Sequence, residues 1–171
     1  MSISPAALSD LIAKELSAVT DARVVGAIRD LLIEPRADLI DWDYGAPNQQ
    51  FLCWTVFHDG KTELEIVFCE NGFGPSMPWG LVNAATPDRR RSMGMDSGWF
   101  ATFLEAWLDS VAATDLDIWR VFERNIDGPS RAVSGELPWT EAWRCRDELA
   151  SANNDARFEV DASLHLEPSR Q

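Results

Sequence analysis

The chain has 171 residues, of which 46% are hydrophobic, and this length is enough for one domain with a full apolar core. Its 28 acidic and 15 basic residues give a net charge of −13, so its surface repels polyanions and nucleic acid is excluded as an expected partner. No stretch approaches the roughly 18 uninterrupted apolar residues of a membrane helix, so we expect no membrane partner either.

The amino-terminal segment and the cysteines indicate a cytoplasmic protein. Asp10 and Glu15 interrupt the stretch that would have to be apolar in a signal peptide. Cys53, Cys69 and Cys145 are an odd number of cysteines at wide spacings, which favours reduced thiols over a disulfide framework. Because no Cys or His pair has a short chelating spacing, we expect no metal site, and no sequence motif implies a cofactor.

Two amphipathic helices are predicted at the start of the chain. Ser4 followed by Pro5 is typical of a helix start, and apolar residues then recur at helical spacing. Asp21 can cap a second helix, which Pro35 is expected to end because proline cannot continue the hydrogen-bond ladder. We therefore expect residues 1–34 to form a helical layer.

Residues 51–68, FLCWTVFHDGKTELEIVF, are the clearest local signal in the chain and indicate two antiparallel strands. Asp59-Gly60 suits a two-residue type I′ turn, in which both central residues need positive φ. Such a turn would place Cys53 opposite Ile66. The sequence therefore predicts a central hairpin with a defined register.

That register decides which side chains of the hairpin share a face of the sheet. Glu63, Glu65 and Trp54 fall on one face, and the two glutamates mark it as at least partly exposed to solvent. Cys53 and Cys69 fall on opposite faces. We therefore expect no disulfide between these two cysteines.

A long polar loop and a long helix are predicted after the strands. Residues 83–96 have no apolar periodicity, and Asp96 or Ser97 can then cap a helix. Its apolar stripe runs from Trp99 to Val111 and should cover the sheet.

The last third of the chain combines one ambiguous segment with two clearer ones. Residues 116–124, LDIWRVFER, fit a helix or a strand equally well. Pro138 opens a further helix to about Ala150, and residues 157–166 alternate as a strand.

The order of these elements predicts an α+β fold, in which a mainly antiparallel sheet with a central Asp-Gly hairpin packs against helices from both ends of the chain. We expect a single domain over residues 1–171. It divides into a helical layer (1–34), antiparallel strands with a Gly/Pro-rich loop (36–82), and helices with a C-terminal strand (96–166).

Residues 69–80, CENGFGPSMPWG, form a loop whose glycines and prolines indicate a rigid shape. Phe73 and Trp79 can anchor it to the core, which favours a structural clamp. The alternative is a ligand loop in which Glu70 and Asn71 face a bound molecule. The glycine spacing fits no nucleotide-binding motif, and the internal prolines remove amide donors that a phosphate cradle needs.

We expect a protein-binding module rather than an enzyme, because no nucleophile motif, metal spacing or nucleotide loop is present. A net charge of −13 favours a basic protein partner. In size and acidity the chain is similar to small immunity proteins that neutralise basic toxins. The candidate contacts are Glu63, Glu65, Glu70, Asn71, Trp79, Trp54 and Asp43.

Two further hypotheses remain open. A small-ligand binder or hydrolase-type enzyme would have its pocket under the 69–80 loop, with Trp42, Trp54 and Trp79 as walls and Asp43 or Glu70 as its polar group. Trp54 is a candidate because it shares the predicted sheet face of Glu63 and Glu65, and Trp42 and Trp79 because they flank irregular segments. A homodimer formed through an apolar patch is the other hypothesis.

One basic run stands out in the acidic chain. Arg89, Arg90 and Arg91 lie a few residues before the predicted long helix, whose N-terminus would also favour an anion. An anion site at this run is one hypothesis, and three solvated arginines that balance nearby acids are the other.

Overall fold

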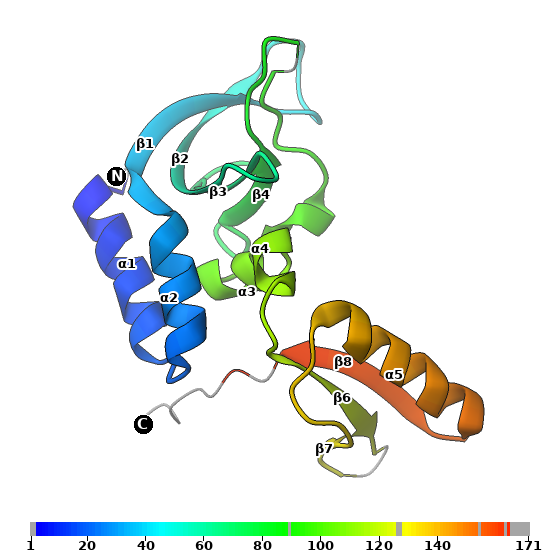
Figure 1. Ribbon diagram of the computed structural model, residues 1–171. Coiled ribbons are helices and arrows are strands. Elements are labelled where there is room, and N and C mark those ends of the chain that lie inside the picture. The colour runs from blue at the N-terminus through cyan, green and yellow to red at the C-terminus, as the bar shows by residue number, and fades with distance from the viewer. Residues whose placement is uncertain (1–2, 89, 126–127, 154, 163, 165–171) are drawn as a thin grey trace.

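The computed structural model describes residues 3–88, 90–125, 128–153, 155–162 and 164. Within them the chain forms five α-helices, one short 3-10 helix and eight β-strands (Figure 1). Five strands form one sheet in the order β1-β2-β3-β4-β5, and three form a second sheet in the order β7-β6-β8. All of these pairings are antiparallel, so the predicted α+β class with antiparallel sheets is confirmed.

Two helices come first in the chain, four strands follow them, and shorter helices and strands make up the rest. The helices are α1 (Pro5–Ser17), α2 (Ala22–Leu31), η1 (Asp96–Gly98), α3 (Phe103–Leu108), α4 (Val111–Thr114) and α5 (Trp139–Ala152). The strands are β1 (Leu32–Asp41), β2 (Gln50–Asp59), β3 (Leu64–Phe68), β4 (Trp79–Asn83), β5 (Trp99–Phe100), β6 (Trp119–Arg124), β7 (Arg131–Ala132) and β8 (Arg157–Ala162). No helix among the described residues has the length and apolar character needed to cross a membrane.

Both amino-terminal helices begin at the predicted caps, but the second ends earlier than expected. The side chains of Ser4 and Asp21 accept hydrogen bonds from the first turns of α1 and α2. Helix α2 stops at Leu31, because Leu32 is extended and the chain enters β1 directly. Pro35 therefore lies inside β1, at an irregularity in the pairing with β2 where its missing N–H is tolerated.

The central hairpin is present, and its turn differs from the predicted one. Asp59 pairs with Leu64, which leaves four residues in the turn instead of two. The Asp59 carboxylate accepts hydrogen bonds from the Lys61 amide at 3.0 Å and from the Thr62 hydroxyl at 2.7 Å. Glu63 completes the turn with φ of 55°. A side chain that bonds to its own turn thus replaces the type I′ geometry.

The longer turn changes the register of the hairpin. Ile66 pairs with Phe57, and not with Cys53 as predicted. An irregularity between Thr55 and Phe57 shifts the register once more, and Trp54 then pairs with Phe68. The predicted assignment of side chains to the two faces of the sheet is therefore wrong.

The predicted long helix after residue 96 is broken into shorter elements. Trp99 begins the short strand β5, and its indole ring lies across Gly80 of β4, where a Cβ atom would meet the ring at 2.6 Å. Thr102 then starts α3 with a capping box in which its hydroxyl accepts from Glu105 and the Glu105 carboxylate accepts from the Thr102 amide. The ambiguous segment 116–124 contains strand β6.

The helix and strand predicted near the C-terminus are confirmed within the described residues. Pro138 precedes α5, which runs along β6 and β8 of the second sheet (Figure 1). The predicted strand 157–166 appears as β8, and positions 163, 165 and 166 lie outside the described residues.

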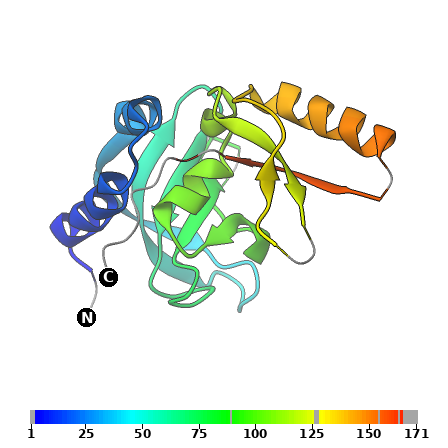
Figure 2. The same cartoon turned by 90° about the horizontal axis from the view of Figure 1, so that it is seen from below.

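Two apolar clusters fill the two faces of the larger sheet. The first lies between this sheet and helices α1, α2 and α3, and it continues to Trp119 of the second sheet and Ala142 of α5 (Figure 2). The second cluster occupies the opposite face of the larger sheet, and we call it the inner cluster. Its buried members are Ile40, Cys53, Val67, Cys69, Val82, Met93 and Trp99.

The chain before β5 returns along the free edge of β1. Ser92 pairs with Asp41 in a short parallel bridge, with hydrogen bonds from the Asp41 amide to the Arg91 carbonyl at 3.1 Å and from the Met93 amide to the Asp41 carbonyl at 3.0 Å. The same chain enters β5 seven residues after Ser92. The strands and this segment thus enclose the inner cluster.

Candidate functional site

Three loops meet beyond one end of the larger sheet. The Asp43 carboxylate accepts hydrogen bonds from the Ser92 hydroxyl at 2.5 Å and from the Gly94 amide at 2.7 Å. These bonds join the loop after β1 to the segment that precedes β5. We call the surface formed there the loop end, and it consists of residues 42–49, 70–77 and 92–97.

Aromatic rings hold the 69–80 loop against the other two. The ring centroid of Phe73 lies 4.9 Å from that of Trp42, 5.8 Å from that of Tyr44 and 5.4 Å from that of Trp99. Tilted and edge-on contacts at these distances stabilise a fixed arrangement. Phe73 is therefore the anchor that ties the loop to the inner cluster.

Glycine is required where the 69–80 loop meets the core. Gly72 has φ of +82°, and a Cβ atom there would come within 2.5 Å of the Met93 Cε. Farther along, the Met77 amide donates to the Gly74 carbonyl at 3.2 Å. These contacts hold the 69–80 loop in one conformation against the core, as expected for a structural clamp.

The loop end exposes two large apolar side chains next to acidic groups. Tyr44 is 59% exposed and Met95 is 64% exposed. They follow Asp43 and Gly94, which are directly hydrogen-bonded, so the two residues lie on adjoining segments of the loop end. Asp96 is exposed beside them.

A hollow of about 290 Å³ lies next to Met95, between β4 and the chain that leads to β5. Its lining mixes polar and apolar residues, among them Arg90, Ser92 and Met95. The surface at the loop end is therefore partly concave.

The remaining residues that the sequence suggested as partner contacts differ in their exposure to solvent. Glu70 and Asn71 are exposed, and the Glu70 carboxylate accepts a hydrogen bond from the Ile3 amide at 3.2 Å. Trp79 is only 1% exposed and packs in the first cluster, where half-buried Trp54 also lies. The structure thus brings Asp43 and the 69–80 loop together, and it turns both tryptophans toward the helices.

The expected solvent-exposed face with Glu63 and Glu65 is absent. Glu63 lies in the hairpin turn, outside β3, and is exposed. Glu65 lies in β3 and is buried, because its carboxylate is paired with the guanidinium of Arg91, with Nη2 2.6 Å from Oε2. The two glutamates therefore do not form one surface.

Arg91 is at the centre of a buried ionic cluster that the sequence did not indicate. Its Nη1 lies 2.6 Å from Oδ2 of Asp38, and its Nη2 donates to the Thr55 hydroxyl at 2.6 Å. Its side chain is 8% exposed. The guanidinium is thus bound to the carboxylates of the sheet, which leaves it little capacity to hold a free anion.

Two further basic side chains complete this cluster from β1 and β2. Arg36 lies 2.9 Å from Asp38 and 3.3 Å from Glu65, and Nδ1 of His58 lies 3.4 Å from Oε1 of Glu65. The Asp38 carboxylate is the main cause of a raised pKa for the Arg36 guanidinium. Opposite charges are therefore balanced within the cluster.

The three arginines of the basic run do not form a shared site in the described part of the chain. Arg90 is exposed and Arg91 is bound in the ionic cluster, while position 89 lies outside the described residues. No local pattern separates these two environments in the sequence, because the partners of Arg91 come from β1, β2 and β3.

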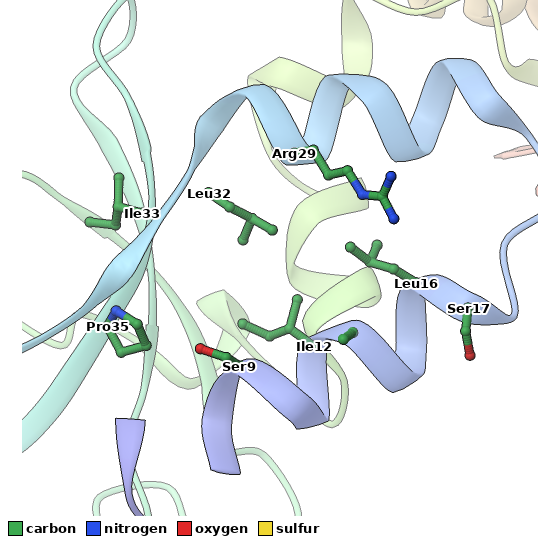
Figure 3. A pocket seen from close by; sticks show the side chains of 9 residues that line it. Ser9, Ile12, Leu16, Ser17, Arg29, Leu32, Ile33 and Pro35 are labelled. Carbon is green, nitrogen blue, oxygen red and sulfur yellow. The ribbon is translucent and has the colours of Figure 1, made fainter. Parts of the chain in front are cut away.

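A separate groove of about 240 Å³ lies between α1, α2 and the start of β1. Figure 3 shows Ile12 and Leu16 of α1 facing Leu32, with Arg29 of α2 at the rim. Among the residues that the structure describes, Arg29 is the only charged one in the lining of the groove, and this lining contains no pair of titratable groups. The groove can hold a small apolar group, but its lining offers no acid-base pair for a reaction.

The chain matches no known protein family, no curated protein and no solved structure in the comparisons.

Proposed function

We propose that this protein binds a basic protein through the loop end. The observation that carries the proposal is the pairing of two exposed apolar side chains, Tyr44 and Met95, with the fixed carboxylate of Asp43 on a rigid surface. Tyrosine and methionine are enriched in protein interfaces, where a few large side chains supply most of the binding energy.

Rigidity favours binding at this surface. Asp43 is held by two hydrogen bonds, and Tyr44 rests against the rings of Trp42 and Phe73. Side chains that are already ordered lose little conformational entropy when a partner binds. The clamp of residues 69–80 is, in this proposal, the support of the binding surface.

Charge defines the class of partner. The chain carries a net charge of −13, and Asp43, Glu70 and Asp96 are exposed at or beside the loop end. Long-range attraction speeds the approach of a basic protein, and these carboxylates then supply ionic contacts at the rim. A basic toxin is one such partner, by analogy with small acidic immunity proteins.

The proposal places the protein in the cytoplasm, because its three free cysteines fit a compartment in which thiols are mostly reduced. The alternative of a ligand pocket under the 69–80 loop has less support. The Phe73 ring and the Met93 side chain occupy the space beneath this loop, and Trp79 faces the other side of the sheet.

The test compares two variants in affinity capture from a lysate of the source organism, followed by titration with the captured partner. Tyr44→Ala/Met95→Ser changes the loop end, and Val111→Ser changes another exposed apolar side chain, 47% accessible, on α4. We expect the first variant to bind a basic partner about tenfold or more weakly, and the second to bind like the wild type.

The controls for this test are the salt dependence of binding and a check for self-association. Binding of a basic partner should weaken as the salt concentration rises. Equal loss of binding in both variants, a partner that is not basic, or self-association alone would overturn the proposal. Thermal unfolding of each variant checks that its fold is intact.

A further inference from the structure

Cys53 of β2 lies opposite Cys69, the residue that directly follows β3. The pairing of Trp54 with Phe68 makes these two cysteines the next residues in register. Both side chains are fully buried in the inner cluster, and the Cys69 thiol lies 3.6 Å from the Leu52 carbonyl, beside Cys53. The expectation that they occupy opposite faces of the sheet is therefore wrong.

The type of pairing places the two backbones at a distance that suits a disulfide. The Cys69 amide donates to the Pro78 carbonyl at 2.8 Å, so its backbone groups point away from β2. Cys53 and Cys69 are then a non-hydrogen-bonded antiparallel pair, whose Cα atoms are typically about 4.5 Å apart. Disulfides span Cα distances of roughly 4.4–6.8 Å, so the bond can form with little movement of either strand.

We propose that Cys53 and Cys69 are a reversible oxidation site that forms an intramolecular disulfide by exchange with a small-molecule disulfide such as oxidised glutathione. The bond joins β2 to the first residue of the 69–80 loop. Both thiols are free in the structure, which represents the reduced state.

The two thiols are not equivalent, and the difference assigns their roles. Cys53 lies inside β2 with its thiol 3.7 Å from the Phe51 carbonyl, whereas Cys69 is the first residue of the 69–80 loop. The interaction between the two side chains lowers the pKa of Cys69 and raises that of Cys53. The Asn71 amide lowers the pKa of Cys69 further. Cys69 directly follows β3 at the start of the loop that opens, whereas Cys53 is held inside β2, so the Cys69 thiolate is the first to meet the small disulfide.

The exchange proceeds in two balanced steps. The Cys69 thiolate attacks one sulfur of the small disulfide, a mixed disulfide forms, and one small thiolate leaves and takes up a proton. Cys53 then loses its proton and attacks the Cys69 sulfur, and the second small thiol leaves. In total, two protein thiols are oxidised and one small disulfide is reduced to two thiols.

Access to the buried sulfurs requires local opening of the loop that follows Cys69. This opening must break the contacts of the Phe73 ring with Trp42 and Trp99, so it is rare and the exchange is slow. These contacts lie on the inner-cluster face of the sheet, so the first cluster can stay folded. Cys145 on α5 is partly exposed and has no cysteine opposite it. We therefore expect a mixed disulfide at Cys145, and an internal disulfide only between Cys53 and Cys69.

The test uses the full chain as wild type, Cys145→Ser, and Cys53→Ala in the Cys145→Ser background. Each protein is equilibrated in buffers of increasing oxidised to reduced glutathione, acid-quenched, unfolded, alkylated and analysed by intact mass and peptide mapping. Cys145→Ser should lose both alkylatable thiols together, with the loss of two hydrogen atoms and no retained glutathione. With Cys53 absent, one glutathione should remain on Cys69.

Thermal unfolding supplies a second readout that needs no additional substitution. A closed loop of this length should raise the Tm of oxidised Cys145→Ser by roughly 6–12 °C over its reduced form. Two thiols that stay alkylatable in Cys145→Ser at every glutathione ratio would overturn the proposal. Formation of intermolecular dimers only, or stable glutathione adducts on both cysteines, would also overturn it.

Discussion

Arg91 and Glu65 form an ion pair inside the larger sheet, with Nη2 2.6 Å from Oε2 and side chains that are 8% and 4% exposed. Arg91 belongs to the segment that returns along β1, whereas Glu65 is the second residue of β3. Arg91 also contacts Asp38 of β1 and Thr55 of β2. One guanidinium therefore connects three strands to the chain that closes the inner cluster.

Removing one partner of this pair should destabilise the protein more than removing both. Arg91→Met leaves the Glu65 carboxylate buried without its closest cation, and we expect a cost of about 3–5 kcal/mol. Arg91→Met/Glu65→Gln removes both charges and should recover a large part of that loss. Urea denaturation of the wild type, both single variants and the double variant measures this coupling. Additive effects of the two substitutions would contradict it.

Alanine substitutions at two nearby glycines of the 69–80 loop distinguish the cost of backbone strain from the cost of a steric clash. Gly72 and Gly74 both have positive φ, but only at Gly72 would a Cβ atom collide with a neighbour, the Met93 side chain at 2.5 Å. We expect Gly74→Ala to cost about 1–2 kcal/mol from backbone strain alone. Gly72→Ala should cost roughly 1–3 kcal/mol more, because the inner cluster must also move.

Chemical denaturation of both alanine variants checks this difference. The clamp description of the loop fails if the two substitutions have the same cost. A milder effect at Gly72 than at Gly74 would likewise show that the loop does not press on Met93.

Asp21 should contribute to stability only above acidic pH. The Arg23 side chain donates to its carboxylate at 2.6 Å, and this bond holds the pKa of Asp21 below its usual value. The stabilisation is therefore present above the unfolded pKa of about 3.9 and is lost as the pH falls through the lower folded pKa.

Asp21→Asn is the matched variant for this prediction, because asparagine can still cap α2. We expect it to be less stable than the wild type at neutral pH and to approach the wild type as the pH falls below about 4. Thermal unfolding of both proteins across this range measures the difference. A difference that stays constant with pH would show that the charge of Asp21 plays no part.

Local signals in the sequence predicted those features of the fold that depend on neighbouring residues. The caps at Ser4 and Asp21 require only a side chain and the next helical turn, and both are present. The helix after Pro138 follows the same logic. The prediction of the hairpin turn was wrong because the Asp59 side chain forms hydrogen bonds within the turn, and a pattern of apolar residues does not indicate such bonds.

Contacts between segments far apart in the sequence account for the other differences between the predictions and the structure. Glu65 is buried because Arg91 reaches it from a different strand edge, and no spacing in the sequence links the two. The predicted helix after residue 96 is interrupted because Trp99 packs on Gly80 of β4. At the candidate site, the sequence identified Asp43 and the 69–80 loop, but the meeting of this loop with Tyr44 and Met95 depends on the tertiary fold.

Site-specific photo-crosslinking from position 44 tests the proposed binding surface most directly. A photoreactive phenylalanine analogue replaces Tyr44 in one protein and Val111 in a control, since both positions are exposed. After irradiation of a lysate of the source organism prepared at increasing salt concentrations, we expect a basic protein attached at position 44, absent from position 111, with a yield that falls as the salt concentration rises. An equal yield from both positions, or a second copy of this chain as the only adduct, would contradict the account.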